Sequence, residues 1–169
     1  MTIFKKYLYG AYGSNMNQDQ MELRSPKAKP YGLILLPDHQ LVFRGVADIE
    51  ESKGSDIPIA LWEITAKDEA ALDAYEGYPW LYDKFKISVK GIDRKVMIYK
   101  MTDRSYQAPP SKSYLSSIAV GYAQFKADPE YIKGAVKRSF IQTSTESVMK
   151  DDQPTQPRRR DLWSPLDRH

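Results

Sequence analysis

The alternation of apolar and polar positions along the chain predicts a strand-rich domain. Six short segments are rich in β-branched and aromatic residues and are bounded by Gly, Pro or Asp, which is typical of β-strands. They cover residues 7–12, 31–36, 40–47, 57–64, 82–90 and 94–102. The connections at 37–39 and 91–93 are short enough to join neighbouring antiparallel strands. Six strands in so short a chain indicate a compact, mixed β-barrel or a strongly coiled sheet.

Apolar positions spaced three and four residues apart predict three helices between and after these strands. The predicted helices cover residues 65–77, residues 111–127, and a stretch that begins at Asp128–Pro129 and carries Ile132, Val136 and Phe140. Thr65 and Asp68 form a weak capping box at the first of them, and Gly77 ends it. Strands and helices follow one another irregularly, so the predicted class is α+β, with helices flanking the barrel.

The apolar pattern fades after Phe140, and we therefore predict a domain over residues 1–140 and a polar, flexible tail over residues 141–169. Only six of the 29 tail residues are apolar, too few for a core of their own. The tail contains Arg158–Arg160 followed by Leu162, Trp163 and Pro165. This run is either a solvated chain end or a short peptide that docks on a partner.

No apolar run approaches the roughly 20 residues that a membrane-spanning helix needs, so we predict no membrane partner. The N-terminal MTIFKKYLYG lacks the apolar stretch and cleavage site of a secretory signal. The expected location is therefore the cytoplasm.

Composition excludes several kinds of chemistry. The chain has no cysteine and only two histidines, His39 and His169, which removes disulfides, thiolate nucleophiles and Cys- or His-rich metal sites. Its net charge of +3 is a small excess of 25 basic over 22 acidic residues, and this does not favour a nucleic-acid partner. The 12 tyrosines are the notable feature, because a tyrosine hydroxyl can line a polar pocket while its ring packs in a core.

A first candidate site lies in Tyr12, Gly13, Ser14 and Asn15, directly after the first predicted strand. Helical spacing resumes at about Asn17. Glycine at a strand-to-helix junction allows a sharp turn, in which successive main-chain N–H groups can face one point and stabilise a carboxylate or an oxyanion. The alternative is an ordinary turn in which Asn15 caps the following helix.

A second candidate is Glu76, which occupies the last helical position before Gly77. Carboxylates are disfavoured there because the negative end of the helix dipole lies at the C-terminus. Four aromatic residues flank it: Tyr75, Tyr78, Trp80 and Tyr82. Burial among such rings and the helix end would both raise the pKa of Glu76 toward neutrality, where it could act as a general base. The alternative is a solvated glutamate at a helix end.

These segments, in this order, resemble the γ-glutamylcyclotransferase-like family, which includes the AIG2-like proteins. The resemblance spans residues 7 to about 122. It rests on Tyr9–Met16, Arg24–Pro26, Leu41–Phe43, Ala60–Ile64, Leu72–Asp73, Glu76–Pro79, Tyr82, Tyr114–Leu115, Ile118 and Gly121.

The resemblance implies a β-barrel flanked by helices, a glutamyl-binding loop at residues 12–15 and Glu76 as catalytic acid/base. It also makes Tyr82 and Tyr114 candidates for hydroxyls lining the pocket, although a face with Tyr114, Ile118 and Tyr122 also suits a core. The implied reaction cyclises a γ-glutamyl compound to 5-oxoproline and releases the amine. It needs no cofactor, because the substrate's own α-amine is the nucleophile.

Two other functions remain open at this point. The same pocket could bind a small carboxylate or peptide end without catalysis, with the tail acting as an adaptor. Weaker still is nucleic-acid binding through Arg158–Arg160 and the lysines, which would be strongly salt-dependent. The leaving amine is not identified by the sequence.

Overall fold

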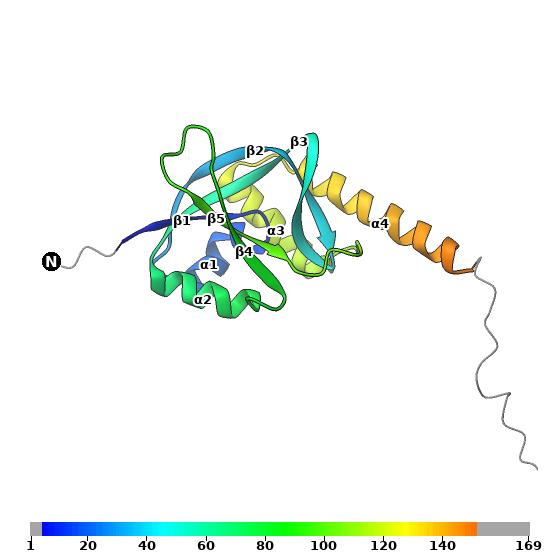
Figure 1. Ribbon diagram of the computed structural model, residues 1–169, viewed down its shortest axis with the longest axis horizontal. Coiled ribbons are helices and arrows are strands. Elements are labelled where there is room, and N and C mark those ends of the chain that lie inside the picture. The colour runs from blue at the N-terminus through cyan, green and yellow to red at the C-terminus, as the bar shows by residue number, and fades with distance from the viewer. Residues whose placement is uncertain (1–4, 152–169) are drawn as a thin grey trace, which may run out of the picture.

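The computed structural model describes residues 5–151 and has the predicted α+β class (Figure 1). Its elements, in chain order, are β1 (Tyr7–Ala11), the 3₁₀ turn η1 (Ser14–Met16), α1 (Gln18–Arg24), β2 (Lys29–Arg44), β3 (Val46–Ile64), α2 (Ala66–Glu76), β4 (Tyr82–Ile87), β5 (Val96–Met101), α3 (Lys112–Phe125) and α4 (Glu130–Asp151). None of the helices in this part of the chain is long and apolar enough to cross a bilayer.

The strands form one five-stranded sheet in the order β2-β3-β1-β5-β4. Strand β1 is central, antiparallel to β3 and parallel to β5. Within residues 5–151 the outer strands β2 and β4 are not paired with each other, so the sheet is open and the predicted closure into a barrel is not found. Because β1 and β5 run parallel, their C-terminal ends lie at the same end of the sheet.

The prediction of separate strands at 31–36 and 40–47 is wrong, which reduces the six predicted strands to five. Residues 31–36 and 40–44 belong to β2, which pairs with β3 along almost its whole length, and residues 46–47 already belong to β3. Pro37 and Asp38 produce only a register shift, with Asp38 in the left-handed region at φ 57°. Strand β3 supplies partners on both sides of this irregularity, so the chain continues as a strand. The hairpin turn lies instead at Gly45.

The strands predicted at 82–90 and 94–102 correspond to β4 and β5. They pair antiparallel as expected, although both are shorter than predicted and their connection is longer than residues 91–93.

Two helices begin where the sequence predicts. Thr65 and Asp68 complete the capping box of α2, and Ser111 caps α3 by accepting from Tyr114 N. The third predicted helix continues to Asp151, past residue 140. The proposed docking peptide around Arg158–Arg160 and Trp163 lies outside the described residues.

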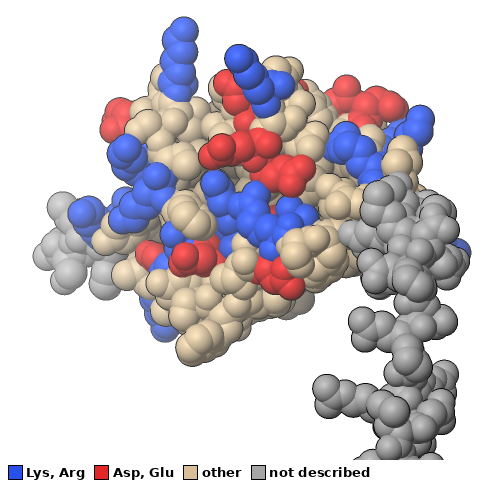
Figure 2. All heavy atoms as spheres, turned by 45° about the vertical axis from the view of Figure 1, so that its right-hand side comes forward, with Lys and Arg blue, Asp and Glu red and all other residues tan. Residues whose placement is uncertain are grey.

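Each α-helix contributes an apolar side chain to one core shared with the sheet: Met21, Leu72, Ile118, Tyr122 and Ile132. Burial of such a side chain stabilises a fold by about 1.5–3 kcal/mol. On the face in Figure 2, basic and acidic side chains are interspersed.

Helix α3 approaches the turn after β1 closely because Gly121 has no side chain. A Cβ at Gly121 would lie 2.5 Å from the backbone of Met16 and Asn17. Asn17 Nδ2 also donates to Ser117 O at 3.1 Å. The fold thereby fixes η1, the segment that carries the first candidate site, between β1 and α3.

Candidate active site

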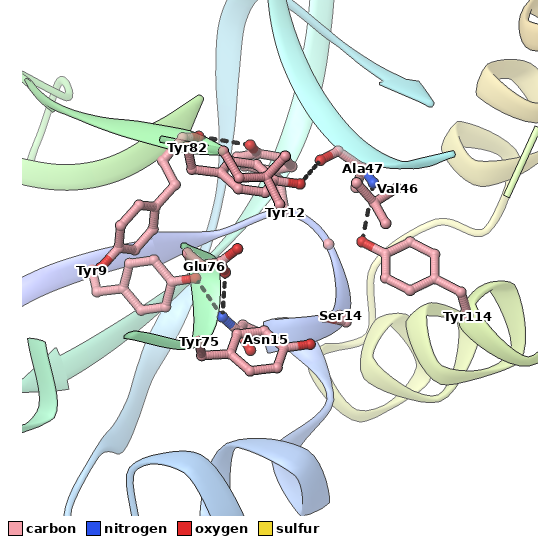
Figure 3. Close-up of a pocket in the computed structure, with 13 residues that line it drawn as sticks. Tyr9, Tyr12, Ser14, Asn15, Val46, Ala47, Tyr75, Glu76, Tyr82 and Tyr114 are labelled. Carbon is pink, nitrogen blue, oxygen red and sulfur yellow. Dashed lines mark hydrogen bonds between the residues drawn. The ribbon is translucent and has the colours of Figure 1, made fainter. Parts of the chain in front are cut away.

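The structure brings the predicted site residues together around one cavity of about 200 Å³ (Figure 3). All seven line it: Tyr12, Gly13, Ser14, Asn15, Glu76, Tyr82 and Tyr114. They come from the link between β1 and η1, from η1 itself, and from α2, β4 and α3, so elements distant in sequence meet here. The remaining wall is formed by Tyr9, Val46, Ala47, Tyr75, Leu81 and Tyr99.

The turn at Gly13 directs η1 along the cavity. A Cβ at Gly13 would lie only 2.9 Å from Ala47 Cβ, so a glycine is needed for the close approach of the hairpin. Met16 N donates to Gly13 O and Asn17 N to Ser14 O. The N–H groups of Ser14 and Asn15 come earlier in this turn and have no acceptor inside it. These two donors are the main-chain groups that a bound oxygen atom could use.

Asn15 is not the cap of the following helix. The side chain that accepts from the first turn of α1 is that of Asn17, through Gln20 N at 3.1 Å. The side chain of Asn15 is buried and donates from Nδ2 to Glu76 Oε1 at 2.9 Å. The alternative prediction that Asn15 caps the following helix is therefore wrong.

Glu76 is half-buried at the end of α2, where Gly77 adopts the left-handed conformation at φ 66° and stops the helix. Burial raises the pKa of Glu76 to about 7, while the positive charge of Arg24 and the hydrogen bond from Asn15 oppose the rise. The predicted shift toward neutrality is confirmed, with burial as its cause. A carboxyl group with this pKa can take up and release a proton near neutral pH.

The aromatic surroundings of Glu76 differ from those predicted. Tyr75 and Tyr82 line the cavity, but Tyr78 does not, and Trp80 is 85% exposed. The prediction that Tyr78 and Trp80 surround Glu76 is wrong, because the chain leaves the helix at Gly77 and turns outward. The other rings that enclose the cavity come from β1, the residue after β1, β5 and α3: Tyr9, Tyr12, Tyr99 and Tyr114.

Two of the predicted hydroxyls hold the tip of the β2–β3 hairpin. Tyr82 Oη donates to Ala47 O at 2.7 Å, and Ala47 N donates to Tyr114 Oη at 3.0 Å. A buried ion pair between Arg44 and Asp48, at 2.9 Å, links the two strands of the same hairpin. These bonds therefore attach Ala47, which forms part of the cavity wall, to β4 and α3.

Sequence reasoning assigned no role to Tyr9 or Arg24, although both contact Asn15. Its Nδ2 donates to Tyr9 Oη at 3.0 Å, and its Oδ1 accepts from Arg24 Nη1. The guanidinium of Arg24 also stacks on the ring of Tyr75, 3.7 Å from its centroid. An arginine in the last turn of a helix is favoured by the helix dipole, so nothing marked Arg24 as unusual.

Among residues 5–151, no three His, Asp or Glu side chains are grouped so that they could hold a metal ion. The residues that line the cavity supply one carboxyl group, tyrosine hydroxyls, the Asn15 amide, a serine hydroxyl and main-chain donors.

Comparisons with known proteins identify relatives in sequence and in fold. The profile of the family described as "Gamma-glutamyl cyclotransferase, AIG2-like" matches residues 9–116. The chain is 30% identical over 148 residues to the γ-glutamylcyclotransferase of Bos taurus, covering 76% of this chain and 77% of the bovine one. It is 28% identical over 146 residues to the Homo sapiens γ-glutamylcyclotransferase, covering 75% and 76%. A solved structure described as a gamma-glutamyl cyclotransferase superposes with a TM-score of 0.69 at 25% identity, covering 78% of this chain and 86% of that one.

Proposed function

The chain belongs to the gamma-glutamyl cyclotransferase, AIG2-like family, and we propose that Glu76 is the acid/base of its reaction. The activity is that of a γ-glutamylcyclotransferase, which cyclises a γ-glutamyl compound to 5-oxoproline and releases the amine. The observation that carries the role of Glu76 is its half-buried carboxyl group, with a pKa of about 7, on the same cavity as Gly13 and Ser14.

The reaction needs a proton acceptor and then a proton donor. The substrate's α-ammonium loses a proton to the Glu76 carboxylate, and the free amine attacks the γ-carbonyl carbon. A C–N bond forms and the carbonyl oxygen becomes negative. The bond to the leaving nitrogen then breaks as the Glu76 carboxylic acid returns the proton to it. The ring nitrogen gives its surplus proton to the Glu76 carboxylate, which passes it to the released amine, so that the products are the neutral lactam of 5-oxoproline and an ammonium ion. No enzyme nucleophile or external water takes part in this sequence.

The negative oxygen of the intermediate needs hydrogen-bond donors that are already in place. The N–H groups of Ser14 and Asn15 serve this purpose, because they start η1 and have no acceptor inside it. They also suit the α-carboxylate of the glutamyl group. The rigid attachment of Ala47 to Tyr82 and Tyr114 supports the role of the opposite wall in keeping the substrate folded.

The cavity size favours a small substrate group. The cavity volume of about 200 Å³ lies below the 300–1,000 Å³ typical of sites for drug-sized ligands. A cavity of this size suits one glutamyl moiety better than a whole peptide. Among the lining side chains, Tyr75 and Leu81 are 47% and 50% exposed. We place the entrance beside them, with the leaving amine pointing toward solvent.

The test is 5-oxoproline release from γ-glutamyl compounds that differ only in the leaving amine: γ-glutamyl amino acids, glutathione and γ-glutamyl amines. We expect product from at least one class, and loss of that product in Glu76→Gln. Glu22→Gln is the matched control, because Glu22 is exposed on α1. Undiminished turnover by Glu76→Gln would contradict the role of Glu76. Calorimetric binding without any product would favour the non-catalytic alternative.

A further inference from the structure

Arg24 does not line the cavity, yet one intervening side chain connects it to the carboxyl group of Glu76. We propose that Arg24 is a positioning residue for the reaction: it fixes the amide of Asn15, and that amide fixes the carboxylate of Glu76. The inference rests on the proposed role of Glu76 as acid/base.

The bonds of Asn15 determine which way its amide faces. An asparagine side chain has one carbonyl oxygen and one NH₂ group with two donors. Both donors are used, toward Glu76 Oε1 at 2.9 Å and Tyr9 Oη at 3.0 Å, and the oxygen accepts from Arg24 Nη1. The reversed amide would place oxygen against a carboxylate and NH₂ against a guanidinium, two repulsive contacts. Arg24 therefore keeps the donor side of Asn15 toward Glu76.

Arg24 is itself held in place from several sides. Its Nη2 donates to Gln20 Oε1 at 2.6 Å, one helical turn earlier in α1, and its Nη1 lies 3.4 Å from Ser14 Oγ. Its guanidinium stacks on Tyr75, the residue before Glu76 in α2. Arg24 thus contacts the end of α2 directly, by stacking on the ring of Tyr75. It also reaches Glu76 indirectly, through two hydrogen bonds that Asn15 bridges.

Arg24 is not among the residues that line the cavity, although it lies next to two that do, Ser14 and Tyr75. It faces a shallow hollow beside the cavity, which it shares with Gln20, Ser14 and Tyr75. Since both donors of Asn15 are also occupied, its side chain supports Glu76, and substrate contact falls to its main-chain N–H. This narrows the substrate-binding role predicted for Asn15.

Arg24 is also the nearby cation that acts on Glu76. The titratable groups around Glu76 on the other elements are tyrosines, each of which burial keeps protonated by raising its pKa: Tyr9 on β1, Tyr12 directly after β1, Tyr82 on β4, Tyr99 on β5 and Tyr114 on α3. Asp48 on β3 is paired with Arg44. Burial raises the pKa of Glu76, and the charge of Arg24 is the largest influence that lowers it.

The experiment is a double-mutant cycle of Arg24→Met and Asn15→Ala, with kcat and KM measured across pH on the best substrate of the panel. We expect Arg24→Met to lower kcat about tenfold or more, with little change in KM, since a hydrogen bond to a charged group is lost. The limb of the kcat profile that reports Glu76 should move to higher pH. In the Asn15→Ala background, Arg24→Met should lower kcat much less, because its connection to Glu76 is already broken.

Arg94→Met is the matched control, because Arg94 also lies over a tyrosine ring, that of Tyr31 at 5.4 Å, away from the cavity. If Arg24→Met does not fold, Arg24→Lys carries the test: it keeps the positive charge, but one ammonium cannot meet Asn15, Gln20 and Tyr75 together. Arg24→Lys should therefore lose kcat.

Three results would overturn the inference: wild-type kcat in Arg24→Lys, fully additive effects in the cycle, or a rise in KM alone, which would indicate substrate binding. A wild-type protein that releases no 5-oxoproline from any compound would instead contradict the proposed function itself.

Discussion

Glu76 should make the protein less stable as pH rises through the range in which its proposed role as a base requires it to be ionised. In the folded protein burial raises the pKa of Glu76 from 4.5 to about 7. Between these two values the unfolded chain releases the proton while the folded protein keeps it, so the free energy of unfolding falls with rising pH and levels off above about pH 7. At 1.36 kcal/mol for each tenfold change in proton affinity, the loss reaches up to about 3 kcal/mol.

The perturbation that isolates this effect is Glu76→Gln, which keeps the shape of the side chain and can still accept from Asn15 Nδ2. Urea unfolding of both proteins at about pH 5 and about pH 8.5 gives four free energies of unfolding. We expect the two proteins to differ little at the lower pH, where Glu76 is protonated when folded. At the higher pH the variant should be more stable by up to about 3 kcal/mol.

The same variant should be nearly inactive, with kcat lower by about 10²- to 10⁴-fold, the usual contribution of a general acid–base group. Loss of activity together with a gain in stability is expected of a catalytic carboxyl group whose charged form is destabilised by burial. A carboxyl group that only supports the fold would not give this combination. A stability difference that is the same at both pH values would refute the reasoning, because the buried charge would then not be its source. Glu22→Gln should change neither quantity.

Three further changes test the walls of the site. Gly13→Ala would bring a Cβ within 2.9 Å of Ala47 Cβ, so we expect kcat/KM to fall and the protein to lose about 1–3 kcal/mol in urea unfolding. Tyr114→Phe leaves the Ala47 N–H without its hydroxyl acceptor; KM for the γ-glutamyl substrate should rise, and unchanged steady-state kinetics would argue against a rigid wall. Gly121→Ala places a Cβ 2.5 Å from the Met16 carbonyl carbon, and thermal unfolding should show a clear loss of stability together with reduced turnover.

Local patterns predicted the elements whose boundaries depend on local bonds. The capping box at Thr65 and Asp68 and the cap at Ser111 involve neighbours in sequence, so α2 and α3 begin as expected. The division of β2 into two strands failed because Pro37 is compatible with either a turn or an irregular strand. The register of β3 decided between them, and register is a long-range property.

The candidate site shows the same distinction. Glu76 breaks a local preference because it is an anion at a helix end, and Gly13 marks a sharp turn after a strand; both signals are visible in sequence. Tyr9 and Arg24 break no such preference, and they enter the site only because α1 and β1 meet α2 in space. The aromatic neighbours of Glu76 were misjudged for the same reason: sequence proximity placed Trp80 beside it, and the fold turned Trp80 outward.

The tyrosines around the cavity suit the proposed role of a single carboxyl group as the base. Among the described residues that line the cavity, Glu76 is the only carboxylate, and six of the others are tyrosines. Burial raises the pKa of Tyr114 to about 12 and also raises the pKa of Tyr9 and of Tyr82 above the usual value, so these hydroxyls stay neutral and cannot compete for the substrate proton. Their rings lower the local polarity, which favours the protonated form of Glu76. Replacing such a ring by a small polar residue should therefore lower the pKa of Glu76 by admitting water, even where the ring touches no substrate.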